Sequence, residues 1–166
     1  ETANTLKYFY INPGSWATGG ALNTARGGLA GAGTQTAALV FGGSTTPPIT
    51  YKAETESYNG TNWTAVNNLN TARKSLAGAG TQTAALAFGG GSPYTAVTET
   101  WNGTNWTEVN DLNTARQQLA GAGTNTAALA FGGEAPPAVA VTESWNGTNW
   151  TEVNDLNSAR RSLGGV

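Results

Sequence analysis

The sequence predicts an all-β protein, a β-propeller of four-stranded antiparallel blades, and three observations lead to this prediction. A Leu-Asn-Thr/Ser-Ala-Arg motif begins at Leu22, Leu69, Leu112 and Leu156, so the chain repeats after 47, 43 and 44 residues. Periods in the forties are typical of propeller blades, but also of helical HEAT and armadillo arrays. Glycine (23 of 166 residues) and recurring Asn-Gly turns disfavour helices. No segment shows the apolar periodicity of a helix, which favours strands.

Four strands can be placed in each unit. In the second unit they cover residues 76–80, 84–88, 97–101 and 106–109. The first strand contains mainly alanine and glycine, which suits the innermost strand of a blade, because blades converge on a central axis and leave little room there. The phenylalanines and tryptophans are expected further out, where neighbouring blades diverge and the gap between them must be filled.

We expect one domain over residues 1–166, with complete blades at 22–68, 69–111 and 112–155. Residues 1–21 and 156–166 correspond to parts of a further blade. A propeller must close its ring or leave strand edges exposed. Two closures stay open. We favour a four-bladed ring whose last blade joins both termini, because it needs no partner; the alternative is self-association of two chains into a ring of about seven or eight blades.

The units resemble kelch repeats. An apolar strand ends in Gly-Gly and is followed by an aromatic residue, a tryptophan five residues later and an arginine before the next unit. These elements are Gly42-Gly43, Tyr58, Trp63 and Arg73; Gly89-Gly90, Trp101, Trp106 and Arg116; and Gly132-Gly133, Trp145, Trp150 and Arg160. The resemblance covers residues 12–163 and implies a propeller of four-stranded antiparallel blades. The repeats are also similar to kelch-type proteins of marine cyanophages and related bacteria.

Composition excludes several classes of function. Galactose oxidase has a kelch-like propeller, but its copper radical site needs His and a Cys cross-linked to Tyr, and this chain has neither His nor Cys. Disulfides, thiol catalysis and Cys/His metal sites are excluded for the same reason, and we expect no cofactor. Eight Lys and Arg against ten Asp and Glu leave a net charge of -2, which does not suit nucleic acid. No apolar run approaches the ~20 residues that span a bilayer, so we expect a soluble chain, in a virion or extracellular setting.

The recurring carboxylates are expected to be structural. Glu56, Glu99 and Glu143 lie two residues before the aromatic residue of the third strand, and strand alternation places them on the face that should be buried. A buried carboxylate needs a partner, and arginine suits this role. We therefore predict Arg–Glu pairs within or between blades, made by the arginine that recurs in each unit. These arginines are Arg26, Arg73, Arg116 and Arg160.

Two further acidic pairs, Glu108 with Asp111 and Glu152 with Asp155, lie at strand ends. Calcium takes six or more oxygen ligands, usually from clustered acids. Two carboxylates in each unit fall short of this number, so we expect no metal site.

The segment after Gly-Gly differs between units in length and content, whereas residues 69–90 and 112–133 agree at 19 of 22 positions. Loops on one face of a propeller often carry recognition, although relaxed constraint would give the same variation. Exposed tyrosines, lysines and prolines in these loops are the candidate contact residues. They are Tyr51, Lys52, Tyr94, Pro136 and Pro137. Residues 27–28, 74–75 and 117–118 also vary and are expected near a mouth of the central channel.

These patterns predict a non-enzymatic binding or structural module, virion- or surface-associated, that contacts a protein or glycan through the loops of one face. The first alternative is a lectin-like propeller with one shallow carbohydrate site per blade, which requires some of Trp63, Trp106 and Trp150 to be exposed. Hydrolase or lyase chemistry using carboxylates and tyrosine ranks last, because no two acids unique to one repeat stand out.

Overall fold

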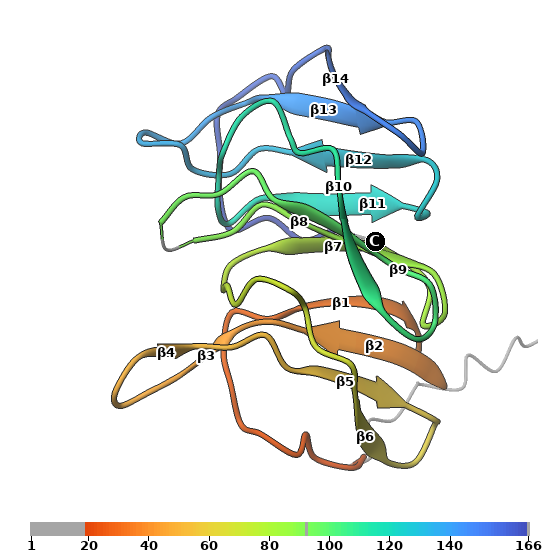
Figure 1. Ribbon diagram of the computed structural model, residues 1–166. Coiled ribbons are helices and arrows are strands. Elements are labelled where there is room, and N and C mark those ends of the chain that lie inside the picture. The colour runs from red at the N-terminus through yellow and green to blue at the C-terminus, as the bar shows by residue number, and fades with distance from the viewer. Residues whose placement is uncertain (1–18, 92, 166) are drawn as a thin grey trace, which may run out of the picture.

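The computed structural model describes residues 19–91 and 93–165, and all regular structure in this part of the chain is β (Figure 1). Three four-stranded antiparallel sheets follow one another along the chain, and a two-stranded hairpin projects from the first. The all-β prediction is confirmed. The three sheets fall within residues 22–68, 69–111 and 112–155.

The strands of each sheet are ordered as they occur in the chain. The first sheet contains β1 (Ala30–Thr34), β2 (Ala37–Phe41), β5 (Thr55–Tyr58) and β6 (Trp63–Val66), and the hairpin contains β3 (Ser44–Thr45) and β4 (Thr50–Tyr51). The second sheet contains β7 (Ala77–Gly80), β8 (Ala85–Phe88), β9 (Thr98–Trp101) and β10 (Trp106–Val109). The third sheet contains β11 (Ala120–Gly123), β12 (Ala128–Phe131), β13 (Thr142–Trp145) and β14 (Trp150–Val153). The predicted strands of the second unit agree with β7–β10 within one residue. The β3–β4 hairpin lies in the variable segment and was not predicted.

The Ala/Gly strands form the contact line between sheets, with β7 lying between β1 and β11. Their backbones approach so closely that no side chain fits at the facing positions. A Cβ atom on Gly78 would lie 2.8 Å from the carbonyl oxygen of Gly31 and 2.7 Å from the ring of Phe41, and one on Gly121 would lie 2.6 Å from the carbonyl oxygen of Gly78. Gly78 and Gly121 are therefore required by the stacking of the units.

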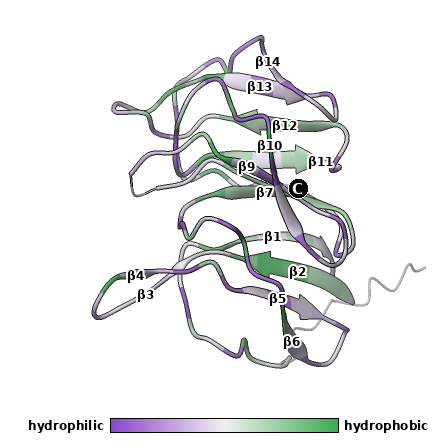
Figure 2. Ribbon diagram, viewed as in Figure 1, coloured by the Kyte–Doolittle hydropathy of each residue, from purple (hydrophilic) through white to green (hydrophobic). Residues whose placement is uncertain are grey.

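Aromatic side chains fill the space between sheets further from this line. Phe41 of the first sheet packs against Trp106 of the second, with ring centroids 4.8 Å apart, and Phe88 packs in the same way against Trp150, at 4.9 Å. Figure 2 shows the strongly apolar β2 within the first sheet. Two equivalent hydrophobic clusters result, one in each gap between sheets.

The Gly-Gly pair connects each unit to the next. The second glycine donates its N–H to the carbonyl of the following arginine, at 2.9 Å for Gly43 and Arg73 and 2.8 Å for Gly90 and Arg116. Gly89 has a φ of +65°, and a Cβ atom there would lie 2.7 Å from the Arg116 oxygen. Left-handed backbone and close approach together explain why glycine recurs at this position.

The predicted fourth blade falls partly outside the described residues, because residues 1–18 are not among them. Residues 156–165 form no strand and lie along the third sheet, where Gly165 packs against the backbone of Gly121. The N–H of Ser162 donates to the carbonyl of Gln118 at 2.9 Å. The described residues thus show three blade-like sheets in series, without a closed ring.

Candidate functional site

The variable segments of the repeat meet at one end of the three sheets. In Figure 1 the β3–β4 hairpin, the β8–β9 connection and the β12–β13 connection all project to the left, and the Asn-Gly turns lie at the opposite end. Isolated β-bridges pair the residue after each arginine with the residue after Gly-Gly. These bridges join Gly27 to Ser44, Lys74 to Gly91 and Gln117 to Glu134. The two variable positions of the repeat are therefore adjacent, and we call residues 44–52, 74, 93–95, 117 and 134–139 the loop surface.

The candidate contact residues differ in exposure. Pro136 and Pro137 are exposed, and Tyr94 is 38% exposed. Tyr51 and Lys52 are half-buried, and both have partners within the chain. The Lys74 ammonium lies 5.7 Å from the centre of the Tyr51 ring, and Lys52 forms an ion pair with Glu54 at 3.2 Å.

Ile49, at 59%, is the most exposed large apolar side chain in the described part of the chain, and sequence reasoning missed it. It follows two prolines in the longest variable loop. Proline lacks a backbone N–H and disfavours strand pairing, so the two prolines mark a loop, and an apolar residue directly after them could have been identified as exposed.

Each of the three sheets has one buried Arg–Glu ion pair. Arg26 pairs with Glu56 at 3.0 Å, and their side chains are 0% and 2% exposed. Arg73 pairs with Glu99 at 2.5 Å, and Arg116 with Glu143 at 2.6 Å. Burial lowers the pKa of the Arg116 guanidinium, whereas the charge and hydrogen bond of Glu143 raise it. Each pair joins the linking segment before a sheet to the third strand of that sheet.

The asparagine three residues before each of these arginines belongs to the same cluster, and sequence reasoning missed it. Asn70 donates both its backbone N–H and its side-chain amide to Oε2 of Glu99, at 2.7 and 2.9 Å. Asn113 makes the same two bonds to Glu143, at 2.7 and 2.8 Å. This asparagine recurs three residues before the arginine, and the regular spacing could have identified it as part of the cluster.

Arg160 differs from the expectation that all four arginines form ion pairs. Its side chain is exposed and its Nε donates to the carbonyl of Ser158 at 3.3 Å, with no carboxylate partner among residues 19–91 and 93–165. The other arginines precede their glutamates by 26 to 30 residues.

The aspartates of the two acidic pairs, Asp111 and Asp155, accept hydrogen bonds from the backbone of the third strand of their sheets. Oδ1 of Asp111 accepts the backbone N–H of Thr98 at 3.0 Å, and Oδ1 of Asp155 accepts that of Thr142 at 3.1 Å. In the first sheet, Asn68 occupies the same position opposite Thr55, at 3.3 Å. An amide can therefore replace the carboxylate, which indicates a hydrogen-bonding role. No group of three or more acidic residues that could hold a metal ion occurs in the described residues.

The tryptophans lie mainly between the sheets. Trp106 and Trp150 are each 5% exposed, and Trp63 is half-buried. The indole N–H of Trp106 donates to Oγ1 of Thr55 at 3.0 Å, and that of Trp150 to Oγ1 of Thr98 at 3.1 Å. Trp106 and Trp150 thus do not offer the exposed ring faces that sugar stacking requires.

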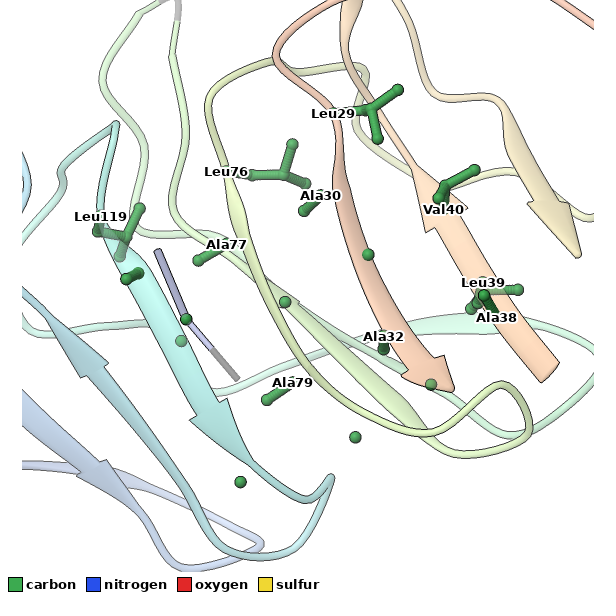
Figure 3. A pocket seen from close by; sticks show the side chains of 18 of the residues that line it. Leu29, Ala30, Ala32, Ala38, Leu39, Val40, Leu76, Ala77, Ala79 and Leu119 are labelled. Atoms are coloured by element: carbon green, nitrogen blue, oxygen red, sulfur yellow. The ribbon is translucent and has the colours of Figure 1, made fainter. Parts of the chain in front are cut away.

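A cavity of about 480 Å³ lies beside the Ala/Gly strands. Figure 3 shows Leu29, Leu76 and Leu119 near it, together with alanines from the first and second sheets. Its lining in the described residues consists of alanine, glycine, leucine and valine. These side chains supply neither a general acid or base nor a charged group, so any polar contact there would come from the backbone.

No protein-family model matches the chain, and no curated protein sequence matches it. The resemblance to kelch repeats therefore rests on the repeated residues alone. The described residues contain no helix that could span a lipid bilayer.

Proposed function

We propose that the chain is a kelch-like β-propeller module that acts without catalysis, by binding a protein ligand through the loop surface. The observation that carries this proposal is the pairing of both variable positions of the repeat at one end of the sheets, through the bridges Gly27–Ser44, Lys74–Gly91 and Gln117–Glu134. Variation confined to one surface on a nearly constant scaffold is the pattern of a recognition surface.

The composition of the loop surface favours a protein ligand over a glycan. Ile49 and Tyr94 are exposed, and so are the prolines beside them in the same loops. Two charged residues of the loop surface have partners of opposite charge, because Glu134 pairs with Arg161 and Lys52 pairs with Glu54. Apolar and aromatic anchors within a polar rim are typical of protein interfaces.

Stacking of sugars on tryptophan lacks comparable support, since Trp106 and Trp150 are buried. Carbohydrate binding is therefore the alternative, and the experiment below tests it separately. Association with a virion or cell surface stays a prediction from the sequence.

The experiment screens the wild-type chain against a random-peptide display library and against a glycan array. We expect peptide binders whose binding is lost in the double variant Ile49→Ser, Tyr94→Ser. Binding should persist in the control Thr104→Ala, because Thr104 is an exposed residue between β9 and β10, and the β9–β10 turn lies at the opposite end of the sheets (Figure 1). Glycan binders, or peptide binders that the double variant retains, would contradict the proposal.

A further inference from the structure

The third sheet exposes an apolar face that is buried in the other two. Leu129 on β12 is 41% exposed and Val153 on β14 is 42% exposed. Leu39 and Leu86, the equivalents of Leu129 in the first and second sheets, are fully buried by the sheet that follows. We call Leu129, Phe131, Thr142 and Val153 the end face; the strand register places Phe131, Thr142 and Val153 side by side on it.

A buried hydroxyl on the end face lacks a hydrogen bond that its equivalents make. Oγ1 of Thr55 and Oγ1 of Thr98 each accept an indole N–H from the following sheet. Thr142 occupies the same position in the third sheet, and its Oγ1 is buried with no hydrogen-bond partner in the described part of the chain. An unpaired buried hydroxyl is costly, so the end face fits a surface that brings an N–H donor to this atom.

The first sheet carries a surface of this kind on its opposite side. Its strand register aligns Ala38, Tyr58 and Trp63 across the sheet, with Val40 on the same face. We call these four residues the start face. Their equivalents in the second sheet are Ala85, Trp101, Trp106 and Ala87, the residues that cover Leu39 and Phe41 of the first sheet. Trp63 is half-buried, whereas its equivalent Trp106 is 5% exposed.

We propose that the end face of one copy binds the start face of a second copy, head to tail. In this contact Trp63 of the second copy packs on Phe131 and donates its indole N–H to Oγ1 of Thr142. This contact would continue the existing stack, because the same pairing of Phe with Trp and of Thr with Trp joins the first sheet to the second and the second to the third. The association is heterologous, so it closes a ring or extends according to the angle between copies.

Residues 156–165 must move aside for this contact, because they lie where the second copy would bring its own residues 22–31. The two segments share the Leu-Asn-Thr/Ser-Ala-Arg motif. The tail is held less firmly than its equivalents: Leu163 is half-buried, whereas Leu76 and Leu119 are each 5% exposed. Arg160 is exposed, whereas the side chain of Arg26 is buried against Glu56. The segment that a second copy brings therefore has its arginine fixed in a buried ion pair, which the tail lacks.

The test is sedimentation equilibrium of the full chain over a wide range of concentrations. The wild-type mass should rise above the single-chain value of 16.9 kDa as concentration increases. Leu129→Arg disables the end face and Ala38→Arg disables the start face, so each variant alone should keep the single-chain mass. An equimolar mixture of the two should form a two-chain complex, because one intact end face and one intact start face remain. The control Ile49→Arg, on the loop surface, should associate as the wild type does.

A second variant keeps the proposal falsifiable if Ala38→Arg does not fold. Leu163→Asp loosens the tail, and it should raise the association constant severalfold. A single-chain mass for the wild type at all concentrations would overturn the proposal, as would undiminished association of Leu129→Arg. A mixture that stays single-chain although both variants fold, or a lowered association constant in Leu163→Asp, would also overturn it.

Discussion

The second and third sheets contain nearly the same residues in different surroundings. Leu86 and Leu129 occupy equivalent positions, but the first is fully buried and the second is 41% exposed. The hydroxyl of Thr98 accepts the indole N–H of Trp150, whereas that of Thr142 has no partner in the described residues. The comparison shows that the repeat encodes a sheet packed on both sides, and that the stability contributed by each side chain depends on the neighbouring unit.

The largest expected difference concerns two arginines at the same position of the repeat. Arg73→Ala leaves Glu99 buried without its charge partner, and it should lower the free energy of unfolding by about 3–5 kcal/mol. Arg160→Ala should change it by less than about 0.5 kcal/mol, because this side chain is exposed. Urea unfolding at low protein concentration measures both values. The double variant Arg73→Met, Glu99→Leu is the control and should recover part of the loss; equal effects of the two alanine variants would contradict the buried pair.

Leu86→Ala and Leu129→Ala test the same contrast in the apolar packing. Loss of the buried Leu86 side chain should lower the free energy of unfolding by about 2–5 kcal/mol, through lost burial and a cavity. Leu129 is partly in contact with solvent in a single chain, so its loss should cost below about 1 kcal/mol. The same unfolding measurement applies, and a larger loss for Leu129→Ala would show that another surface covers the third sheet.

Gly78→Ala and Gly31→Ala test the close approach of the inner strands. At Gly78 the added methyl meets the Gly31 oxygen, and the strain should cost about 1–3 kcal/mol. At Gly31 the nearest atom would be the Leu39 oxygen at 3.3 Å, so alanine should change the free energy of unfolding by below about 0.5 kcal/mol. Thermal unfolding followed by circular dichroism would register the difference. Equal tolerance of alanine at both positions is incompatible with stacked inner strands.

The smallest expected effect concerns the threonine hydroxyls. Thr98→Val removes the acceptor of the Trp150 indole N–H and should lower the free energy of unfolding by about 1–2 kcal/mol. Thr142→Val removes a buried hydroxyl without a partner in the described residues and should be neutral or stabilising in a single chain. Chemical unfolding of both variants measures this contrast, and a loss of stability in Thr142→Val would mean that its hydroxyl has a partner.

The strands could be predicted from the sequence because repetition shows which positions are constrained. The Ala/Gly strand, the Gly-Gly stop and the Asn-Gly turn each have a local physical reason, and β7–β10 begin and end within a residue of the predicted bounds. The carboxylates of Glu56, Glu99 and Glu143 could be placed on a buried face from strand alternation alone. Their arginine partners followed from the cost of burying a charge.

Other features depend on contacts between segments that lie far apart in the sequence, which local patterns do not reveal. The asparagine that binds Glu99 together with Arg73 is one example, because polar residues in linking segments are usually solvated. The pairing of Lys74 with Gly91 is another, since these residues lie 17 positions apart and belong to segments that vary between units. The exposure of Leu129 depends on which surface packs against the third sheet, and its neighbours in the strand are the same as those of the buried Leu86.

Hydrogen exchange of the indole N–H groups, followed by NMR in a dilute sample, tests most directly whether the repeats stack through a common interface. The indole protons of Trp106 and Trp150, each buried and bonded to a threonine of the preceding sheet, should exchange slowly. That of Trp63, which is half-buried whereas Trp106 and Trp150 are buried, should exchange faster. Exchange at Trp106 and Trp150 as fast as at Trp63 would show that the sheets do not pack in this way.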